Sequence, residues 1–335
     1  MTTAEAPATR KLSYVASITE ALSQLMRADP DIFIAGEDVG VYGSVFGVTR
    51  GMMKEFGENR VVDTPIAESG IMGLGLGAAA TGLRPIIDIM FMDFMGVCMD
   101  ELVNQVAKMK YMFGGKATLP LTIHTMAGGG MSMAAQHSQS LEAWFCHIPG
   151  LKVVMPSGAY EAKGLMIAAV RDDNPVIVVN IKTLLGSQAE VPEEMYEIPL
   201  GKAHIARAGT NFTIVASGRM VGESLKAAAA LVEDGLDVEV IDPRTLQPFD
   251  TETVVASVKK THRALVAHEA VRFGGIGAEF AAQIQEEAFD YLDAPVGRVG
   301  APFAPVPFSP ALEKHYIPNA ESIAAEVRRL LGKRG

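Results

Sequence analysis

Short runs of β-branched and apolar residues alternate with longer, Ala-rich stretches along the chain. In the longer stretches, such as 160–170, apolar residues recur at the spacing of an amphipathic helix. Strands that alternate with helices in this way predict a parallel sheet with helices on both faces. The strands of the first half are predicted at 32–35, 85–89, 121–125, 152–155 and 176–180.

A second series of elements follows a polar, Pro-containing segment that lacks a clear period, KTLLGSQAEVPEEMYEIPLG, which predicts a linker. Strands of this series are predicted in FTIVASG, DVEVIDPRT, RALVAHE and VGRV. The Pro-rich APFAPVPFSP predicts an extended surface crossing. The helices are predicted at RMVGESLKAAAALVEDG, 251–260, 276–289 and 320–331.

The expected fold class is therefore α/β, with two domains that each contain a mainly parallel sheet flanked by helices. The chain has 335 residues, which is enough for two such domains. We expect a flexible N-terminus at 1–11, a first domain at 12–185, a linker at 186–210 and a second domain at 211–335.

Composition and charge narrow the class of protein. With 49% hydrophobic and 20% charged residues, the chain is expected to fold around large cores. A net charge of -10 without a basic stripe argues against a nucleic-acid partner. There is no apolar stretch long enough for a bilayer, and the N-terminal segment has no signal-peptide or transit-peptide character, so we expect no membrane partner and a bacterial-type cytoplasmic location. Cys98 and Cys146 lie in apolar runs, which favours two buried thiols over a disulfide.

The segment DTPIAESGIMGLGLGAAATG places Gly73, Gly75 and Gly77 in a predicted helix, where each glycine costs roughly 1 kcal/mol relative to alanine. Gly75, Gly77 and Ala80 formally match a dinucleotide-binding fingerprint, but they follow a Pro-containing loop rather than a strand. The alternative is a close approach of two helices across a subunit interface. We favour this second explanation.

Two residues are candidates for proton chemistry. Glu68 precedes the glycine-rich helix and is either a catalytic acid or an ordinary acid of the first helical turn. His137 follows a flexible glycine run and is either a proton carrier or a histidine that caps the next helix. The histidines show no metal-ligand spacing, and the nucleophile elbow and phosphate-loop motifs are absent from the sequence.

Eight short motifs occur in one order across the chain, from about 12 to 331: GEDVG, RVVDTPIAESG, RPIIDIMFMDF, MFGGKA, AQHSQSLEAWF, PGLKVVMPS, DPRTLQPFD and PVPFSPALEKHYIP. Together they resemble the β subunits of the thiamine-diphosphate-dependent components of 2-oxo acid and acetoin dehydrogenase complexes. The resemblance implies a pyrimidine-binding domain followed by a transketolase C-terminal-like domain.

The resemblance also implies roles for individual residues. Glu68 matches the glutamate that binds the pyrimidine nitrogen of thiamine diphosphate, the cofactor that accepts electrons during carbon-carbon cleavage. Glu37 matches a second acid in a hydrogen-bond relay, and His137 matches a histidine that helps acyl transfer to a lipoyl group. The residues expected to line the cofactor are Phe94, which stacks on the pyrimidine, Met90 and Ile66.

Some relatives also hold a monovalent cation. The matching residues offer one carboxylate and several carbonyl oxygens, a hard-ligand set that suits potassium. The alternative is a simple polar turn after a helix. The residues of this expected potassium site are Leu121, Ala169, Val170, Asp172 and Asn174.

The family binds the cofactor diphosphate and Mg²⁺ through a GDG motif, which this chain lacks; the nearest string is Glu233-Asp234-Gly235. The resemblance therefore implies an α subunit that holds the diphosphate and Mg²⁺ in an α2β2 heterotetramer, and a lipoyl-bearing dihydrolipoamide acyltransferase as the next partner. Met90 favours a pyruvate or acetoin enzyme over a branched-chain type. The strings DFMGVC, MFGGKA, IHTMAGGG and VPFSPALEKHYIP resemble acetoin-type β subunits, so acetoin is the expected substrate and pyruvate the alternative. A nicotinamide-dependent dehydrogenase and a non-catalytic scaffold remain as further alternatives.

Overall fold

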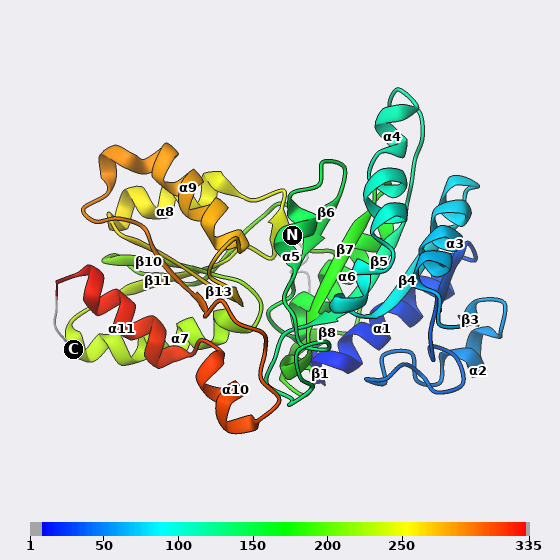
Figure 1. Cartoon of the computed structure of the whole chain (residues 1–335), viewed down its shortest axis with the longest axis horizontal. Helices are drawn as coiled ribbons and strands as arrows, with labels where there is room; N and C mark the ends of the chain where they lie inside the picture. The colour runs from blue at the N-terminus through cyan, green and yellow to red at the C-terminus, as the bar shows by residue number, and fades with distance from the viewer. Residues whose placement is uncertain (1–8, 333–335) are drawn as a thin grey trace, which may run out of the picture.

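The computed structural model describes residues 9–332, which form two α/β parts side by side (Figure 1). Within the described residues, the first part is built on a seven-stranded sheet. All neighbouring strands are parallel except the first pair at one edge, which is antiparallel. In spatial order the strands are β12 (Thr245–Gln247), β6 (Lys152–Val154), β7 (Val176–Ile181), β5 (Thr122–Ala127), β4 (Arg84–Phe91), β2 (Ile32–Gly36) and β3 (Val61–Asp63).

The central strands of this sheet are buried on both faces, which explains their nearly continuous apolar sequence. In β7, Val176 and Val178 pack toward α1 (Tyr14–Ala28) and α6 (Ala159–Arg171). The alternate residues Ile177 and Val179 pack on the other face, in the cluster that also contains α3 (Glu68–Ala80). The other short helical elements of this part are α2 (Met52–Phe56), the 3-10 helices η1 (Met92–Gly96) and η3 (Lys182–Leu184), the π-helix η2 (Glu101–Val106), α4 (Met109–Met112) and α5 (Glu142–Cys146).

The second part contains a five-stranded sheet within the described residues. Its strands, in spatial order, are β14 (Gly297–Ala301), β13 (Ala264–Val271), β10 (Phe212–Ala216), β11 (Val238–Asp242) and the antiparallel edge strand β9 (His204–Arg207). In Figure 1 one pair of helices covers each face. These pairs are α7 (Arg219–Leu231) with α11 (Ala320–Leu330), and α8 (Thr251–Thr261) with α9 (Ile276–Ala288).

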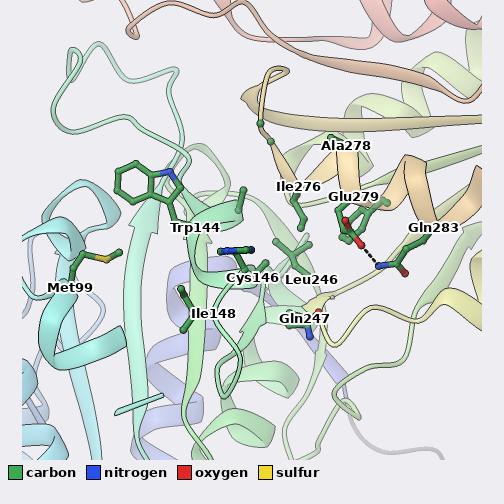
Figure 2. Close-up of a pocket in the computed structure, with 15 residues that line it drawn as sticks. Met99, Trp144, Cys146, Ile148, Leu246, Gln247, Ile276, Ala278, Glu279 and Gln283 are labelled. Carbon is green, nitrogen blue, oxygen red and sulfur yellow. Dashed lines mark hydrogen bonds between the residues drawn. The ribbon is translucent and has the colours of Figure 1, made fainter. Parts of the chain in front are cut away.

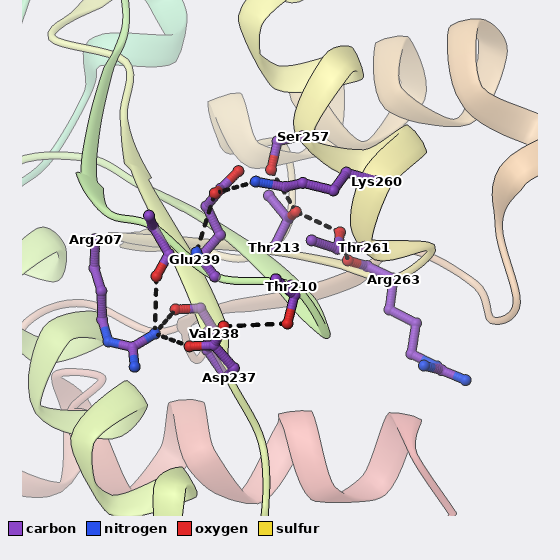
Figure 3. Close-up of polar contacts among 12 residues, drawn as sticks. Arg207, Thr210, Thr213, Asp237, Val238, Glu239, Ser257, Lys260, Thr261 and Arg263 are labelled. Carbon is purple, nitrogen blue, oxygen red and sulfur yellow. Dashed lines mark hydrogen bonds and ion pairs between the residues drawn. The ribbon is translucent and has the colours of Figure 1, made fainter.

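A polar network fastens α8 to this second sheet (Figure 3). The Thr213 hydroxyl in β10 is 2.7 Å from that of Ser257 and 2.6 Å from that of Thr261, both in α8. The buried carboxylate of Glu239 in β11 accepts hydrogen bonds from Lys260 of α8 and from the amide of Gly209. Each of these buried side chains therefore has at least one hydrogen-bond partner, as a stable interior requires.

The two parts share one hydrophobic cluster. It joins Ile123 and Ile177 of the first sheet to Val254, Val266 and Phe280 of the second part. β12 strengthens this connection, because it follows β11 in sequence but pairs with β6 of the first sheet. The predicted α/β class with two mainly parallel sheets is confirmed.

Several edge elements differ from the sequence expectations. The segment predicted as a linker at 186–210 contains β8 (Gln188–Pro192), which pairs antiparallel with β1 (Thr9–Ser13), and also β9. Residues 1–8 of the expected flexible N-terminus lie outside the described residues, and 9–11 belong to β1. The expected extended crossing ends in a short helix, α10 (Pro310–Tyr316), which has proline at a favoured first-turn position.

The two cysteines do not form a disulfide. Cys98 and Cys146 are both free; the first is buried and the second is half-buried. Burial raises the pKa of the Cys98 thiol to about 12, so this group is a poor nucleophile at neutral pH.

Between residues 9 and 332, the helices are too short or too polar to cross a bilayer.

Candidate functional site

Four residues named from the sequence lie just beyond the carboxyl ends of neighbouring strands. Glu37 directly follows β2, and Glu68 opens α3 after β3. Phe94 lies in η1 after β4, and His137 lies in the loop after β5. Because β3, β2, β4 and β5 are parallel neighbours, these positions converge on one edge of the sheet. This is the edge where open α/β sheets bind their ligands.

The two acids at this edge influence each other. Burial, followed by the charges of Glu68, Asp38 and Asp88, raises the pKa of Glu37. The Oε1 atom of Glu37 is buried and has no hydrogen-bond partner among the described residues. Glu68 is the first residue of α3, so the helix dipole also favours its charge there. The pair thus combines a carboxyl whose pKa is raised with a second acid at the start of a helix, an arrangement that suits proton exchange with a ligand.

His137 lies in a cluster of aromatic rings. Its ring centroid is 4.8 Å from that of Phe91 and 5.3 Å from that of Phe94, in edge-to-face geometry. The structure therefore brings the predicted His137 and Phe94 together. His137 does not cap the following helix, because the residue at the N-cap of α5 is Leu141.

Phe91 and Lys182 belong to this cluster but were not identified from the sequence. Lys182 follows β7, is almost fully buried, and donates a hydrogen bond to the carbonyl of His137. Its ammonium lies 5.3 Å from the centroid of the Phe91 ring. Burial lowers the pKa of Lys182 to about 8, against the opposing charges of Asp93, Glu269 and Glu313. A lysine directly after the fully buried strand VIVVNI is the signal that would have pointed to it.

The two remaining cofactor-lining candidates differ in exposure. Met90 is half-buried in β4, one residue before the aromatic cluster begins. Ile66 is 83% exposed in the loop before α3, so this chain alone does not enclose it. Val41 and Tyr42, in the loop after β2, are also exposed. Apolar side chains that are exposed together near a candidate site are typical of an interface.

The expected potassium site lies at the opposite edge of the same sheet, where the strands begin. One residue precedes β5, and the others lie between the last turn of α6 and the start of β7. The amide of Val176 donates to the carbonyl of Leu121 at 3.0 Å and joins these segments. The site is thus separated from the two acids by the length of the strands. It comprises Leu121, Ala169, Val170, Asp172 and Asn174.

Basic side chains already contact oxygens of this group. Lys152 donates to the carboxylate of Asp172, and the amide of Asn174 donates to the same carboxylate at 2.9 Å. Although burial raises the pKa of Asp172, these two bonds bring it below its usual value. Arg84 donates to the carbonyl of Val170 at 3.1 Å. No group of three or more histidine, cysteine, aspartate or glutamate side chains between residues 9 and 332 is arranged to hold a metal ion.

The glycines of α3 face two different environments. A Cβ atom on Gly75 would lie 2.4 Å from Cγ1 of Ile87, so this glycine allows the helix to pack on its own sheet. A Cβ atom on Gly73 or Gly77 would meet nothing within 4 Å among the described residues outside its own helix. The dinucleotide fingerprint falls inside the helix, where amides bond to the preceding turn and are not free for phosphate.

A separate crevice of about 870 Å³ opens between α5 and α9 (Figure 2). Trp144 and Cys146 of α5 line one side, and Glu279 and Gln283, joined by a 2.9 Å hydrogen bond, line the other. Burial raises the pKa of the Cys146 thiol, so it does not supply a nucleophile. The site residues predicted from the sequence do not line this crevice.

Comparison with known proteins follows the division seen in the structure. Residues 10–188 match the model of the transketolase pyrimidine-binding domain, and residues 201–323 match that of the transketolase C-terminal domain. The fold is similar to a solved chain described as a split-gene transketolase in an inactive beta4 tetramer. That match has a TM-score of 0.79, is 23% identical, and covers 96% of this chain and 99% of the other.

Relatives in bacteria match over nearly their whole length. The β subunit of acetoin:2,6-dichlorophenolindophenol oxidoreductase is 46% identical in Bacillus subtilis, covering 97% of this chain and 98% of the relative. The subunit of that name from Cupriavidus necator is 47% identical, covering 96% and 98%. The β subunit of the pyruvate dehydrogenase E1 component from Staphylococcus epidermidis is 46% identical, covering 96% and 99%. The chain therefore belongs to the transketolase-like family of β subunits from thiamine-diphosphate-dependent acetoin and 2-oxo acid dehydrogenase components.

Proposed function

We propose that this chain is the β subunit of an α2β2 thiamine-diphosphate-dependent enzyme that cleaves acetoin and passes the two-carbon unit to a lipoyl carrier. The observation that carries the proposal is the convergence of Glu37, Glu68, Phe94 and His137 at the carboxyl edge of the first sheet. We place the enzyme in the bacterial cytoplasm, with a lipoyl-bearing dihydrolipoamide acyltransferase as its next partner.

The residues at this edge fit the pyrimidine half of the cofactor. Glu68 would bind the ring nitrogen, Phe94 would stack on the ring, and Met90 and Ile66 would line it. The buried oxygen of Glu37 that lacks a partner supports a polar ligand at this place. When bound, the cofactor supplies the electron sink for carbon-carbon cleavage.

Three residues of this chain would have separate roles in proton transfer. Glu68 holds or releases a proton at the ring nitrogen, and Glu37, with its raised pKa, supplies a hydrogen bond that steadies the charge of Glu68. His137, whose ring contacts that of Phe94, would orient or protonate the group transferred to the lipoyl carrier.

The diphosphate half of the site and Mg²⁺ would come from the α subunit. The absence of a GDG motif from the sequence supports this division. The exposed Val41, Tyr42 and Ile66 near the site, and the open flank of α3 at Gly73 and Gly77, provide the kind of surface that such a subunit would cover.

The substrate is tested by reconstitution with the α subunit. We expect the complex to reduce an artificial electron acceptor faster with acetoin than with pyruvate, and we expect the β chain alone to be inactive. Pyruvate is the second candidate because relatives named for pyruvate dehydrogenase are 46% identical. A higher kcat/KM with pyruvate would reject acetoin and establish the second candidate.

A potassium ion at the opposite sheet edge is a separate part of the proposal. The carbonyls of Leu121, Ala169 and Val170 support it, whereas Lys152 competes for the carboxylate of Asp172. Because this edge is remote from Glu68, the ion would stabilise the fold rather than react. We expect K⁺ to raise the melting temperature of the full chain above its value in Na⁺ at equal ionic strength; equal values would remove the ion from the proposal.

A further inference from the structure

The loop that carries His137 is fastened to the second part of the molecule. The amide of Gly129 donates to Oε1 of Glu269 in β13 at 2.6 Å. The amides of Gly130 and Ser132 donate to the two carboxylate oxygens of Glu313 in α10, at 2.6 and 2.9 Å. Both acids are buried, with 8% and 3% of their surface exposed. Two carboxylates from one sheet domain thus satisfy three amides of a loop on the other.

The glycines of this loop are required by the close approach. Gly128 has φ +89°, and a Cβ on it would lie 2.9 Å from the carboxylate of Glu269. Gly130 has φ +99°, and a Cβ on it would lie 2.8 Å from the side chain of Thr183. Ser132 adopts φ 53° although it has a side chain. Such a conformation persists only where the surroundings hold it, and here Glu313 does so. The glycine run is therefore an anchored segment rather than a flexible one.

The far end of the same loop is held by the first part of the molecule. Lys182 donates to the carbonyl of His137. The side-chain amide of Gln139 donates to the carboxylate of Asp93 at 2.9 Å. His137 therefore lies between one anchor on each part of the molecule.

We propose that Glu313, assisted by Glu269, is a positioning residue that holds the glycine-rich loop and thereby places His137 at the carboxyl edge of the first sheet. This proposal rests on the proposed role of His137 in transfer to the lipoyl carrier. It gives a role to the motif PVPFSPALEKHYIP, which contains Glu313. A carboxylate suits the task because amide bonds to a charged acceptor are shorter and stronger than bonds to a neutral one.

The test uses Glu313→Gln in the full-length chain co-expressed with its α subunit. Glutamine keeps the size of the side chain but has one acceptor oxygen, and its NH₂ group would face an amide donor. We expect hydrogen exchange across 128–134 to speed up by about tenfold or more, because those amides lose their partners. We expect the lipoyl-dependent rate to fall by about tenfold or more, because misplaced groups lose effective molarity. Reduction of an artificial acceptor should stay within about twofold, because it does not need transfer to the lipoyl carrier.

Glu161→Gln is the matched control. Glu161 in α6 also reaches across the two parts, to Arg244 at 2.7 Å, but it does not contact the loop. We expect Glu161→Gln to leave hydrogen exchange across 128–134 unchanged, and also the ratio of the lipoyl-dependent rate to the artificial-acceptor rate. Glu313→Asp keeps the charge and should recover part of the ratio of the lipoyl-dependent rate to the artificial-acceptor rate. If Glu313→Gln fails to fold, Glu313→Asp is measured for loop exchange and for this ratio instead, and we expect smaller effects on both.

Three outcomes decide the matter. Unchanged exchange in Glu313→Gln would show that the acid does not hold the loop and would overturn the proposal. Faster exchange with an unchanged lipoyl-dependent rate would show that holding the loop does not position His137, and would overturn it as well. His137→Ala tests the proposed function separately: if that variant transfers normally to the lipoyl carrier, the role of His137 fails whatever Glu313 does.

Discussion

An acid in the first turn of a helix is favoured by the helix dipole, so the position of Glu68 alone is compatible with a structural role. The surroundings of Glu37 distinguish this structural role of Glu68 from a role in proton transfer. Burial and the charge of Glu68 raise the pKa of Glu37, and one of its carboxylate oxygens is buried without a partner in the described part of the chain. Two acids coupled in this way suit proton handling better than capping.

Replacement of Glu68 by glutamine removes the ionisable carboxyl group and keeps the size of the side chain. In the reconstituted complex, we expect Glu68→Gln to lower kcat for artificial-acceptor reduction by at least about 10²-fold, within the range typical of acid-base groups. The measurement is steady-state turnover with acetoin. Glu58→Gln, which changes an exposed acid near α2, serves as the control and should keep full turnover. Normal turnover in Glu68→Gln would instead favour the scaffold alternative.

At the residue scale, the sequence motifs identified the main candidate site residues. Their contacts in three dimensions could not be predicted from the sequence. His137 and Phe94 stand 43 positions apart in sequence, and their ring contact of 5.3 Å depends on the adjacency of β4 and β5. Lys182 reaches His137 from the turn that follows β7, and β7 lies on the other side of β5. A linear pattern does not specify which strands are neighbours.

At the scale of the element, α3 offers a matched pair of substitutions. Gly75→Ala should lower the free energy of unfolding of the full chain by about 1–3 kcal/mol, because the new methyl group would overlap Ile87. Gly77→Ala should raise it by up to about 1 kcal/mol, because alanine favours the helix and the position is open. Chemical denaturation of the isolated chain measures both changes.

Gly77→Ala also tests whether the open flank of α3 is an interface with the α subunit. We expect Gly77→Ala to weaken assembly with the α subunit even though it stabilises the chain, because a methyl group there would keep a neighbouring helix at a distance. Size-exclusion chromatography with light scattering reports the assembly. Undiminished assembly in Gly77→Ala would show that this flank is not in contact.

The strands that the sequence analysis missed are short and lie at sheet edges. β8 and β1 are each five residues long, and each depends on the other for its hydrogen bonds. β12 has three residues and pairs with β6, more than 90 positions away in sequence. Such strands carry little periodic signal of their own, because pairing rather than burial of an apolar face defines them.

At the scale of the whole molecule, the contact between the two parts includes buried charged groups. Asp242 in β11 accepts hydrogen bonds from Ser157, which follows β6, and from the amide of Arg244 at 2.9 Å. Burial raises the pKa of Asp242 to about 7, with the charge of Glu161 adding to the effect and the bond from Ser157 opposing it. This acid therefore links the stability of the molecule to pH.

The sign of that link follows from the pKa in each state. Because the folded pKa of about 7 exceeds the unfolded value, the folded chain binds more protons between about pH 4 and 7. The stability that Asp242 contributes is complete below that range and is lost as pH rises through 7. Asp242→Asn should make the decline in unfolding free energy between pH 5 and 7 shallower, by at most about 1.4 kcal/mol per pH unit.

Denaturant titrations at several pH values measure this slope. Asp250→Asn is a suitable control: burial raises the pKa of Asp250, but bonds from Ala203 and Thr253 bring it below its usual value. Its contribution therefore changes only below about pH 4, and the slope above pH 5 should stay as in the wild type. An unaltered slope in Asp242→Asn would show that the pKa of Asp242 is not raised in the folded chain.

The sequence by itself determined the α/β class and the order of the main strands and helices, because burial of apolar faces and local turn chemistry set the pattern of residues along the chain. It identified Glu68 and His137 through the motifs that resemble the family, since local chemistry left a structural role open for both. Only the tertiary structure decided that β12 crosses to the first sheet, that Lys182 and Phe91 surround His137, and that Glu313 anchors its loop. These are contacts between distant segments, and each depends on strand order and on the packing of one domain against the other.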